Sequence, residues 1–345
     1  MLWLTRWNKL RIRSAHARHA KAGGGRRGDF YRSVWKQEAA AVGAAITFLD
    51  RSTAEISRGG RTLRVEANVT SIDDPVTRSI AGDKAMVLKL LGDHGIPTPH
   101  WHTCGPDDVF AARRFLRGLP GPCVVKPASS TGAGRGITTG VDDTTHLILA
   151  MARAAAYCDE IVLEEQVAGG VYRLLYLDGE LLDAVERRPP WVRGDGVSSV
   201  RQLVEAENQA RADGGLEVSQ TMIGVDRELV QTLRGAGLRL SSVPPRGSVV
   251  RLKQVVNDNR SDDNVAAAGR VCDELRSVGA KAAAVVGVRL AGVDVMTTDP
   301  SLPLEQSGGV VIEVNTSPGF YYHYIRSGGS CPVARLILER WLDGR

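Results

Sequence analysis

Two apolar runs, residues 285–296 and 310–314, are joined by a connector rich in Pro, Gly and Ser and place the strongest restriction on the fold. Such a pattern predicts two adjacent antiparallel strands. Glu313 and Asn315 are two residues apart and so project from one strand face, while Asp294 lies in the neighbouring run. Because Asp and Asn are rare in strands, their presence favours a bound ligand. Two carboxylates and an amide suit Mg²⁺, and a solvated sheet face is the alternative.

The length and composition indicate a globular protein of two or three lobes. The chain has 345 residues, 43% of them hydrophobic and 24% charged, and no apolar run approaches the roughly 18 residues of a membrane span. Its five cysteines are scattered and form no CxxC pair, which is typical of reduced thiols. We therefore expect a soluble, cytoplasmic protein without a membrane span.

The basic charge belongs to the first segment of the chain. Residues 1–30 hold eight Lys and Arg against Asp29 alone, so of the totals of 44 and 39 the remaining residues carry 36 basic and 38 acidic side chains. A flexible or partner-docking arm over residues 1–28 is the favoured interpretation, and a helix that binds a membrane surface or nucleic acid is the alternative. The near-neutral remainder argues against nucleic acid as a partner.

A second chemical feature follows a short strand that ends at Lys126. The next segment, ASSTGAGRGI, contains Ser129, Ser130, Thr131, Gly132 and Gly134. Glycines let the backbone approach an anion, while hydroxyl and amide groups donate to phosphate oxygens. The segment matches no Walker A or GxGxxG motif, and alone it is more often a plain loop.

Several regular elements are also predicted. The patterns predict strands around Gly59 and Gly60, helices over 84–94, 142–156 and 333–342, a strand over 160–167, a hairpin around Asp178 and Gly179, a polar helical insertion over about 195–245, a strand over 249–256 and a helix over 265–284.

These residues, taken in order, resemble the ATP-grasp superfamily of carboxylate–amine ligases. The likeness runs from about Asp73 to Gly329, and its motifs are AGDK, CVVKPASSTGAGRGI, GVDVM and VIEVNTSPGF. Within the superfamily the chain is most similar to the ATP-grasp region of cyanophycin synthetase, with glutathione synthetase and D-alanine–D-alanine ligase more distant. The second, Mur-ligase-like half of cyanophycin synthetase is absent from this sequence, so synthesis of that polymer by this chain alone is not expected.

The resemblance implies an α/β fold of the α+β ATP-grasp type. Antiparallel sheets flanked by helices would form three lobes, with ATP held between two of them. The expected divisions are an arm over 1–28, an N-terminal lobe over 29–105, a central lobe over 106–170 and a C-terminal lobe over 171–345 that contains the metal site and the insertion.

The resemblance also implies roles for individual residues. Nucleotide contacts would come from Lys84, Lys126, Ser129, Ser130, Thr131, Gly132, Gly134, Glu164, Glu165 and Val167. The ligands of two Mg²⁺ ions, which Mn²⁺ could replace, would be Asp294, Glu313 and Asn315. Catalytic roles would fall to Arg173, Lys253 and Asn257. Val171 stands where relatives place an acidic residue for the ribose, which leaves ribose recognition open.

The function that follows is the joining of a carboxylate to an amine through an acyl-phosphate, with release of ADP and phosphate. The substrates would be an amino acid or small peptide and an amine-bearing amino acid, in a specialised biosynthetic pathway. Arg187, Arg188 and Arg193 either anchor a substrate carboxylate or are surface charges. The alternatives are a ligase that modifies a protein or ribosomal peptide, or a non-catalytic ATP-binding regulator. A dimer or a tetramer is compatible with the sequence.

Overall fold

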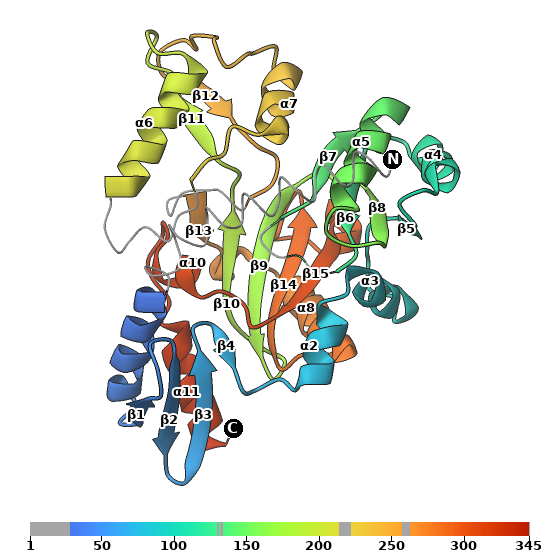
Figure 1. The fold of residues 1–345 in the computed structure, drawn as a ribbon. Helices are drawn as coiled ribbons and strands as arrows, with labels where there is room; N and C mark the ends of the chain where they lie inside the picture. Colours follow the sequence, from blue (N-terminus) through green and yellow to red (C-terminus); the bar gives the residue numbers. More distant parts are fainter. Residues whose placement is uncertain (1–27, 130, 132–133, 214–221, 257–262, 345) are drawn as a thin grey trace.

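The computed structural model describes residues 28–129, 131, 134–213, 222–256 and 263–344. The predicted arm lies almost entirely outside these residues. The described chain is a mixed α/β structure in which antiparallel sheets are flanked by helices, as predicted (Figure 1). None of its helices combines the length and apolarity that crossing a bilayer would require.

The first sheet has the order β1-β2-β3-β4, and the helix over residues 28–41 packs beside it (Figure 1). The strands are β1 (Ala45–Phe48), β2 (Thr53–Arg58), β3 (Arg61–Glu66) and β4 (Val69–Thr70). The predicted turn at Gly59 and Gly60 is confirmed, and both residues have a positive φ that only glycine adopts readily. The C-terminal helix α11 (Val333–Asp343) contacts β3 and closes this part of the core.

The largest sheet has the order β13-β10-β9-β14-β15, and every pairing in it is antiparallel. Its strands are β9 (Gly170–Leu177), β10 (Glu180–Arg187), β13 (Asn264–Ala266), β14 (Leu290–Thr297) and β15 (Val310–Thr316). Alternate residues of β9 face two cores: Leu174 and Tyr176 pack with α3 (Lys84–Asp93) and α8 (Asp273–Val286), while Leu175 and Leu177 pack towards the N-terminal sheet. Burial on both faces makes this sheet the centre of the fold.

The third sheet has the order β5-β8-β6-β7 and lies beside the large sheet (Figure 1). It comprises β5 (Trp101–Cys104), β6 (Cys123–Pro127), β7 (Thr138–Val141) and β8 (Ile161–Glu165), covered by α4 (Val109–Gly118) and α5 (Thr144–Ala154). Leu88 of α3, Ala128 and Val162 form a small apolar cluster between these elements. The backbone N–H of Lys84 donates to the Ala128 carbonyl at 2.8 Å, which joins the start of α3 to the end of β6.

The predicted insertion forms a separate small unit. It contains the two-stranded ribbon β11 (Trp191–Arg193) and β12 (Val249–Arg251), with α6 (Val200–Asp213) and α7 (Arg227–Gly235) packed on it around their own apolar core. The ribbon projects from the end of the large sheet, and α7 turns back towards α5 (Figure 1). The Gln231 side chain contacts the His146 ring at 2.7 Å, which links the insertion to the third sheet.

Aspartate caps explain where several helices begin. The helices α2 (Pro75–Ala81), α3, α4, α5 and α7 each follow an aspartate whose side chain accepts a backbone N–H of the first turn, namely Asp74, Asp83, Asp108, Asp143 and Asp226. Such a bond satisfies one of the amide groups that a helix start leaves unpaired, and it is worth about 1 kcal/mol.

Within residues 249–284, two predicted element boundaries were wrong. The helix expected over 265–284 is replaced at its start by β13 and a 3₁₀ turn (Ala268–Arg270), and α8 begins only at Asp273. The strand expected over 249–256 ends at Arg251, because Glu228 of α7 accepts the backbone N–H groups of Gln254 and Val255 at 3.0 Å each. In both segments tertiary hydrogen bonds override the local pattern. The remaining short helices are α9 (Leu304–Ser307) and α10 (Tyr321–Tyr324).

The pairing of strands bears on the expected divisions of the chain without testing them. Trp101–Cys104, at the end of the expected N-terminal lobe, pairs with β8 of the third sheet. At the other end of the chain, α11 contributes to the core of the first sheet. The divisions therefore stay a proposal about how the chain is organised.

Candidate active site

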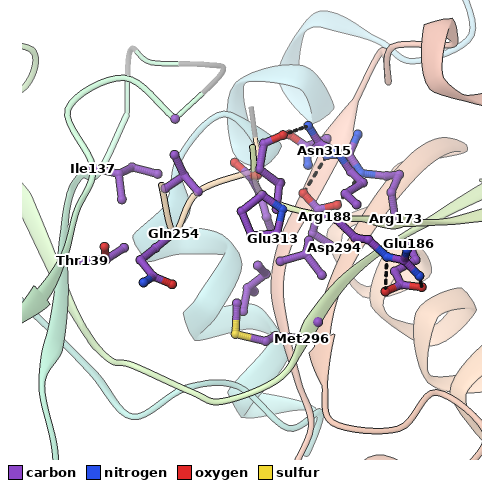
Figure 2. A pocket seen from close by; sticks show the side chains of 18 of the residues that line it. Ile137, Thr139, Arg173, Glu186, Arg188, Gln254, Asp294, Met296, Glu313 and Asn315 are labelled. Carbon is purple, nitrogen blue, oxygen red and sulfur yellow. Dashed lines mark hydrogen bonds and ion pairs between the residues drawn. The ribbon is translucent and has the colours of Figure 1, made fainter. Parts of the chain in front are cut away.

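A cavity of about 960 Å³ lies between the third sheet and the large sheet (Figure 2). Its wall includes eleven of the sixteen predicted site residues: Lys84, Lys126, Thr131, Gly134, Glu164, Glu165, Val167, Arg173, Asp294, Glu313 and Asn315. These residues come from α3, β6, the following loop, β8, β9, β14 and β15. Tertiary folding thus brings together side chains that the sequence spreads over more than two hundred positions.

The hairpin predicted from the runs 285–296 and 310–314 is present, but its first strand begins only at Leu290, because α8 extends to Val286. Strands β14 and β15 are antiparallel neighbours, and Asp294 lies opposite Glu313 in the register, with Gly292 opposite Asn315. Direct cross-strand partners project from the same face of a sheet. The three oxygen-bearing side chains therefore point together, as Figure 2 shows.

Asp294 is already engaged by an arginine from the next strand. Arg173 lies opposite Asp294 on β9, and its Nε and Nη2 donate to the two carboxylate oxygens at 2.5 and 2.6 Å. Arg173 Nη1 donates to the Tyr322 hydroxyl at 2.7 Å. Both members of the ion pair are buried. Burial alone would lower the pKa of Arg173, but Asp294 raises it, so the guanidinium stays charged.

Glu313 faces two lysines across the cavity. Lys84 Nζ lies 3.5 Å from Glu313 Oε1, and about a third of the Glu313 side chain is exposed. Burial would raise the pKa of Glu313, but the charges of Lys84, Lys126 and Arg173 outweigh it and hold that pKa below its ordinary value. Glu313 is therefore an anion at neutral pH.

Lys126 forms a buried ion pair with Glu164 of the adjacent strand. Sequence reasoning assigned these two residues to different ends of a nucleotide and missed their contact. Thr131 and Gly134 of the following loop also line the cavity, whereas Ser129 lies close to Cys158, with 3.4 Å between Ser129 Oγ and Cys158 Sγ. Ser130 and Gly132 lie outside the described residues.

The oxygen atoms of this site fit a divalent cation of the Mg²⁺ type. Asn315 Nδ2 donates to the Gly292 carbonyl at 3.3 Å, which directs its amide oxygen away from that bond. Each Asp294 oxygen accepts one arginine N–H and keeps a second lone pair. Among the described residues no cluster of three or more His, Cys, Asp and Glu could hold a metal. The donor set thus consists of two carboxylates and an amide, which leaves coordination positions for water and phosphate.

Of the two remaining predicted catalytic residues, the structure describes Lys253. Lys253 is buried, and its Nζ donates to Asp226 Oδ2 at 2.8 Å rather than contributing to the cavity wall. Its neighbours Gln254, Val255 and Val256 do line the cavity, so Lys253 anchors the segment that approaches it. Asn257 lies outside the described residues. Both assignments stay predictions.

The structure separates the three arginines whose role the sequence left open. Arg187 and Arg188 line the cavity, whereas Arg193 is not among the described lining residues and donates to the Gly247 carbonyl at 3.0 Å. Arg188 Nε and Nη2 donate to Glu186 Oε1 and Oε2 at 3.0 and 3.2 Å. Figure 2 shows this pair at the cavity edge. The Arg187 guanidinium lies 5.0 Å from the centre of the Tyr322 ring.

Several lining residues were missed by sequence reasoning. One group is apolar and includes Val124, Ile137, Met296 and Ile312. Each lies on or next to a strand and reads as core in the sequence, so no local signal distinguishes it. The other group is aromatic and consists of Tyr31, Trp191, Tyr321 and Tyr322. The dipeptide Tyr321-Tyr322 directly follows the motif of the metal-type strand, and that position was an available signal.

Comparison with known proteins gives consistent relatives. No protein-family model matches the chain. It is 32% identical over 269 residues to the cyanophycin synthetase of Nostoc sp. (strain PCC 7120), a match that covers 77% of this chain and 29% of that protein. It is 32% identical over 284 residues to the cyanophycin synthetase of Synechocystis sp. (strain PCC 6803), covering 81% and 32%. The chain therefore spans less than a third of the length of these relatives.

A second kind of relative is a glutathione-producing protein. The glutathione biosynthesis bifunctional protein GshAB of Desulfotalea psychrophila is 25% identical over 294 residues, which covers 83% of this chain and 37% of that protein. Among solved structures, a bifunctional glutathione synthetase from Pasteurella multocida superposes with a TM-score of 0.57 at 24% identity, covering 88% of this chain and 42% of the other. That structural likeness concerns the fold.

Proposed function

We infer that this chain, which belongs to the ATP-grasp superfamily and resembles the ATP-grasp region of cyanophycin synthetase, joins a carboxylate to an amine with cleavage of ATP to ADP and phosphate. The observation that carries the proposal is the convergence on one cavity of two lysines, two residues of the Gly/Ser-rich loop and three oxygen-bearing side chains from two adjacent strands. A cavity of about 960 Å³ has the size of a ligand site for a nucleotide and a small substrate.

We place the nucleotide between the two sheets. Val124, Ile137, Met296 and Ile312 supply apolar walls suited to a flat base, and Lys84 and Lys126 supply positive charge for its phosphates. Thr131 and Gly134 lie where the loop would cover the phosphates. Asp294, Glu313 and Asn315 would hold Mg²⁺, which neutralises the charge of the phosphates during transfer.

The proposed reaction has two steps. In the first step, a substrate carboxylate oxygen attacks the γ-phosphorus in line, and the bond between that phosphorus and the bridging β-phosphate oxygen breaks. The products of this step are ADP and an acyl-phosphate. The amine then attacks the acyl carbon, and phosphate departs as the amide bond forms. Arg173, fixed by Asp294 and Tyr322, lies next to the proposed metal ligands and would stabilise the negative charge that develops on oxygen.

Closure of the loop after Lys126 would protect the acyl-phosphate from water. Water hydrolyses an acyl-phosphate, so the reacting atoms must be shielded. The loop after Lys126 is rich in glycine, and Gly134 and Gly136 adopt positive φ values of 70° and 82°. We propose that this loop excludes water when nucleotide is bound.

The test is ADP release from Mg-ATP across a matrix of amino acids and dipeptides. Wild-type protein should release ADP with particular carboxylate and amine pairs, and Glu313→Ala should lose at least about a hundredfold of that rate, because an oxygen ligand of the metal disappears. Glu305→Ala is the matched control, since Glu305 is exposed and lies outside the cavity wall. An equal rate in the Glu313 variant, or the absence of ADP with every pair, would contradict the proposal.

A further inference from the structure

The cavity has a second region whose chemistry the nucleotide does not use. It is formed by two facing segments, residues 187–191 and 251–256. Hydrogen bonds hold the segments together: Leu252 N–H donates to the Pro190 carbonyl at 2.9 Å, and Arg187 Nη2 donates to the Val256 carbonyl at 3.4 Å. This region lies at the base of the helical insertion, where the ribbon of β11 and β12 begins and ends. It is therefore separate from the proposed nucleotide site.

Trp191 and Arg251 are presented together on this wall. They are direct partners in the antiparallel register of β11 and β12, and both line the cavity. Cross-strand partners share one face of a ribbon, with Cβ atoms about 5 Å apart. The Trp191 ring is held in place, because its Nε1 donates to Asp263 Oδ1 at 2.6 Å and the Arg193 guanidinium lies 5.3 Å from its centre.

Arg251 differs in its charge partners from four other cations of the cavity. Lys84, Lys126, Arg173 and Arg188 each contact a carboxylate, namely Glu313, Glu164, Asp294 and Glu186. Within the part of the chain that the structure describes, Arg251 forms no ion pair; its side chain is exposed, and its Nη1 donates to the neutral Gln254 Oε1 at 3.3 Å. A cation in a concave wall, beside a fixed aromatic ring, is suited to a carboxylate attached to a flat or apolar group.

We propose that Trp191 and Arg251 form a recognition subsite for the amine substrate of the ligase, and that this substrate is an amino acid or dipeptide with an aromatic side chain. Arg251 binds the α-carboxylate that does not react, and the aromatic side chain packs against Trp191. The proposal rests on the proposed ligase function and adds the class of the amine substrate and the residues that select it. The free amine is then the end of the substrate that points towards the reacting carboxylate.

Binding can be measured without turnover. The full chain is titrated calorimetrically, in the presence of Mg²⁺ and a non-hydrolysable ATP analogue, with two matched pairs: phenylalanine and phenylalaninamide, and glycyl-phenylalanine and its amide. Each pair keeps the amine and the ring and differs only in the carboxylate. In at least one pair we expect the acid to bind about tenfold or more tightly than the amide, as a charged hydrogen bond in a cavity implies.

Two variants assign that preference. In Arg251→Gln, the binding affinities of the acid and the amide should differ by no more than about twofold. Trp191→Leu should weaken both members of the pair while the preference for the acid remains. Arg246→Gln is the matched control: Arg246 is an exposed arginine of the same insertion that does not line the cavity, and its replacement should change neither ligand.

The outcomes separate this inference from the ligase proposal. Equal affinity of acid and amide in wild type, no binding in either pair, or an unchanged preference in Arg251→Gln would overturn the subsite. An Arg251→Gln variant that loses affinity for the ATP analogue instead would assign Arg251 to phosphate, which also overturns it. If ADP is released with other amines but the expected binding preferences are not found, the subsite proposal is wrong and the ligase proposal stands. Because Arg251 is exposed, its variant is expected to fold even if the Trp191 variant does not.

Discussion

Replacement of Asp294 by asparagine should destabilise the protein strongly, because it leaves a buried arginine without its counter-charge. The side chains of Arg173 and Asp294 are 8% and 7% exposed, and the two hydrogen bonds between them are 2.5 and 2.6 Å long. Breaking a buried ion pair from one side costs about 3–5 kcal/mol. Tyr322 still accepts a hydrogen bond from Arg173, so we expect a loss of about 3 kcal/mol.

Asp178→Asn supplies a control with the same geometry and different burial. Asp178 accepts from Arg289 Nε and Nη2 at 2.6 and 2.9 Å, but the two side chains are 37% and 48% exposed. An exposed pair is worth at most about 1 kcal/mol. Asp178 has a φ of 51°, a conformation that asparagine also adopts. The free energy of unfolding of the Asp178 variant should therefore be close to that of the wild type.

The assay is urea unfolding followed by far-UV circular dichroism, with wild type and both variants at the same pH. A shift in Asp294→Asn no larger than the shift in Asp178→Asn would refute the reasoning, because burial would then not govern the cost. The double variant Arg173→Met/Asp294→Met gives a second check. With both charges removed, it should recover much of the stability that Asp294→Asn loses, while it remains inactive.

Three further predictions concern other parts of the structure. In Gly292→Ala the new Cβ would lie 2.9 Å from Pro318 Cβ and 3.1 Å from Arg173 Cδ and Nη1, so Pro318 or the guanidinium must shift, and ADP release should fall more than thermal stability does. Burial lowers the pKa of His323 below its ordinary 6.5 and outweighs Asp183, so the unfolded state binds more protons at low pH. The free energy of unfolding should therefore fall as pH decreases through about 6.5, and a titration of unfolding against pH should show a smaller decrease in His323→Gln. Burial raises the pKa of Cys123 to about 12, so alkylation at pH 8, read by mass spectrometry, should modify this thiol only after unfolding.

Much of the local structure could be predicted from the sequence because its causes are local. The Gly59-Gly60 turn, the helix that begins at Lys84 and the β14–β15 hairpin each follow from turn residues, caps or apolar periodicity within a few positions. The prediction of a helix over 265–284 was wrong for its first residues, because they pair with β10, which is far away in the sequence. No periodicity near Asn264–Ala266 carries that information.

The candidate site divides in the same way. The amino-acid pattern alone indicated which chemical groups the site contains: the proposed metal ligands Asp294 and Glu313 on neighbouring strands, the lysines, and the loop after Lys126. The partners of these groups became visible in the folded structure, such as Arg173 on Asp294 across 121 residues, and so did the position of Trp191 beside Arg251. This difference follows from the range of the interactions. Propensity, capping and periodicity act within a few residues, whereas an ion pair or a cavity wall requires groups that approach only when separate sheets pack together.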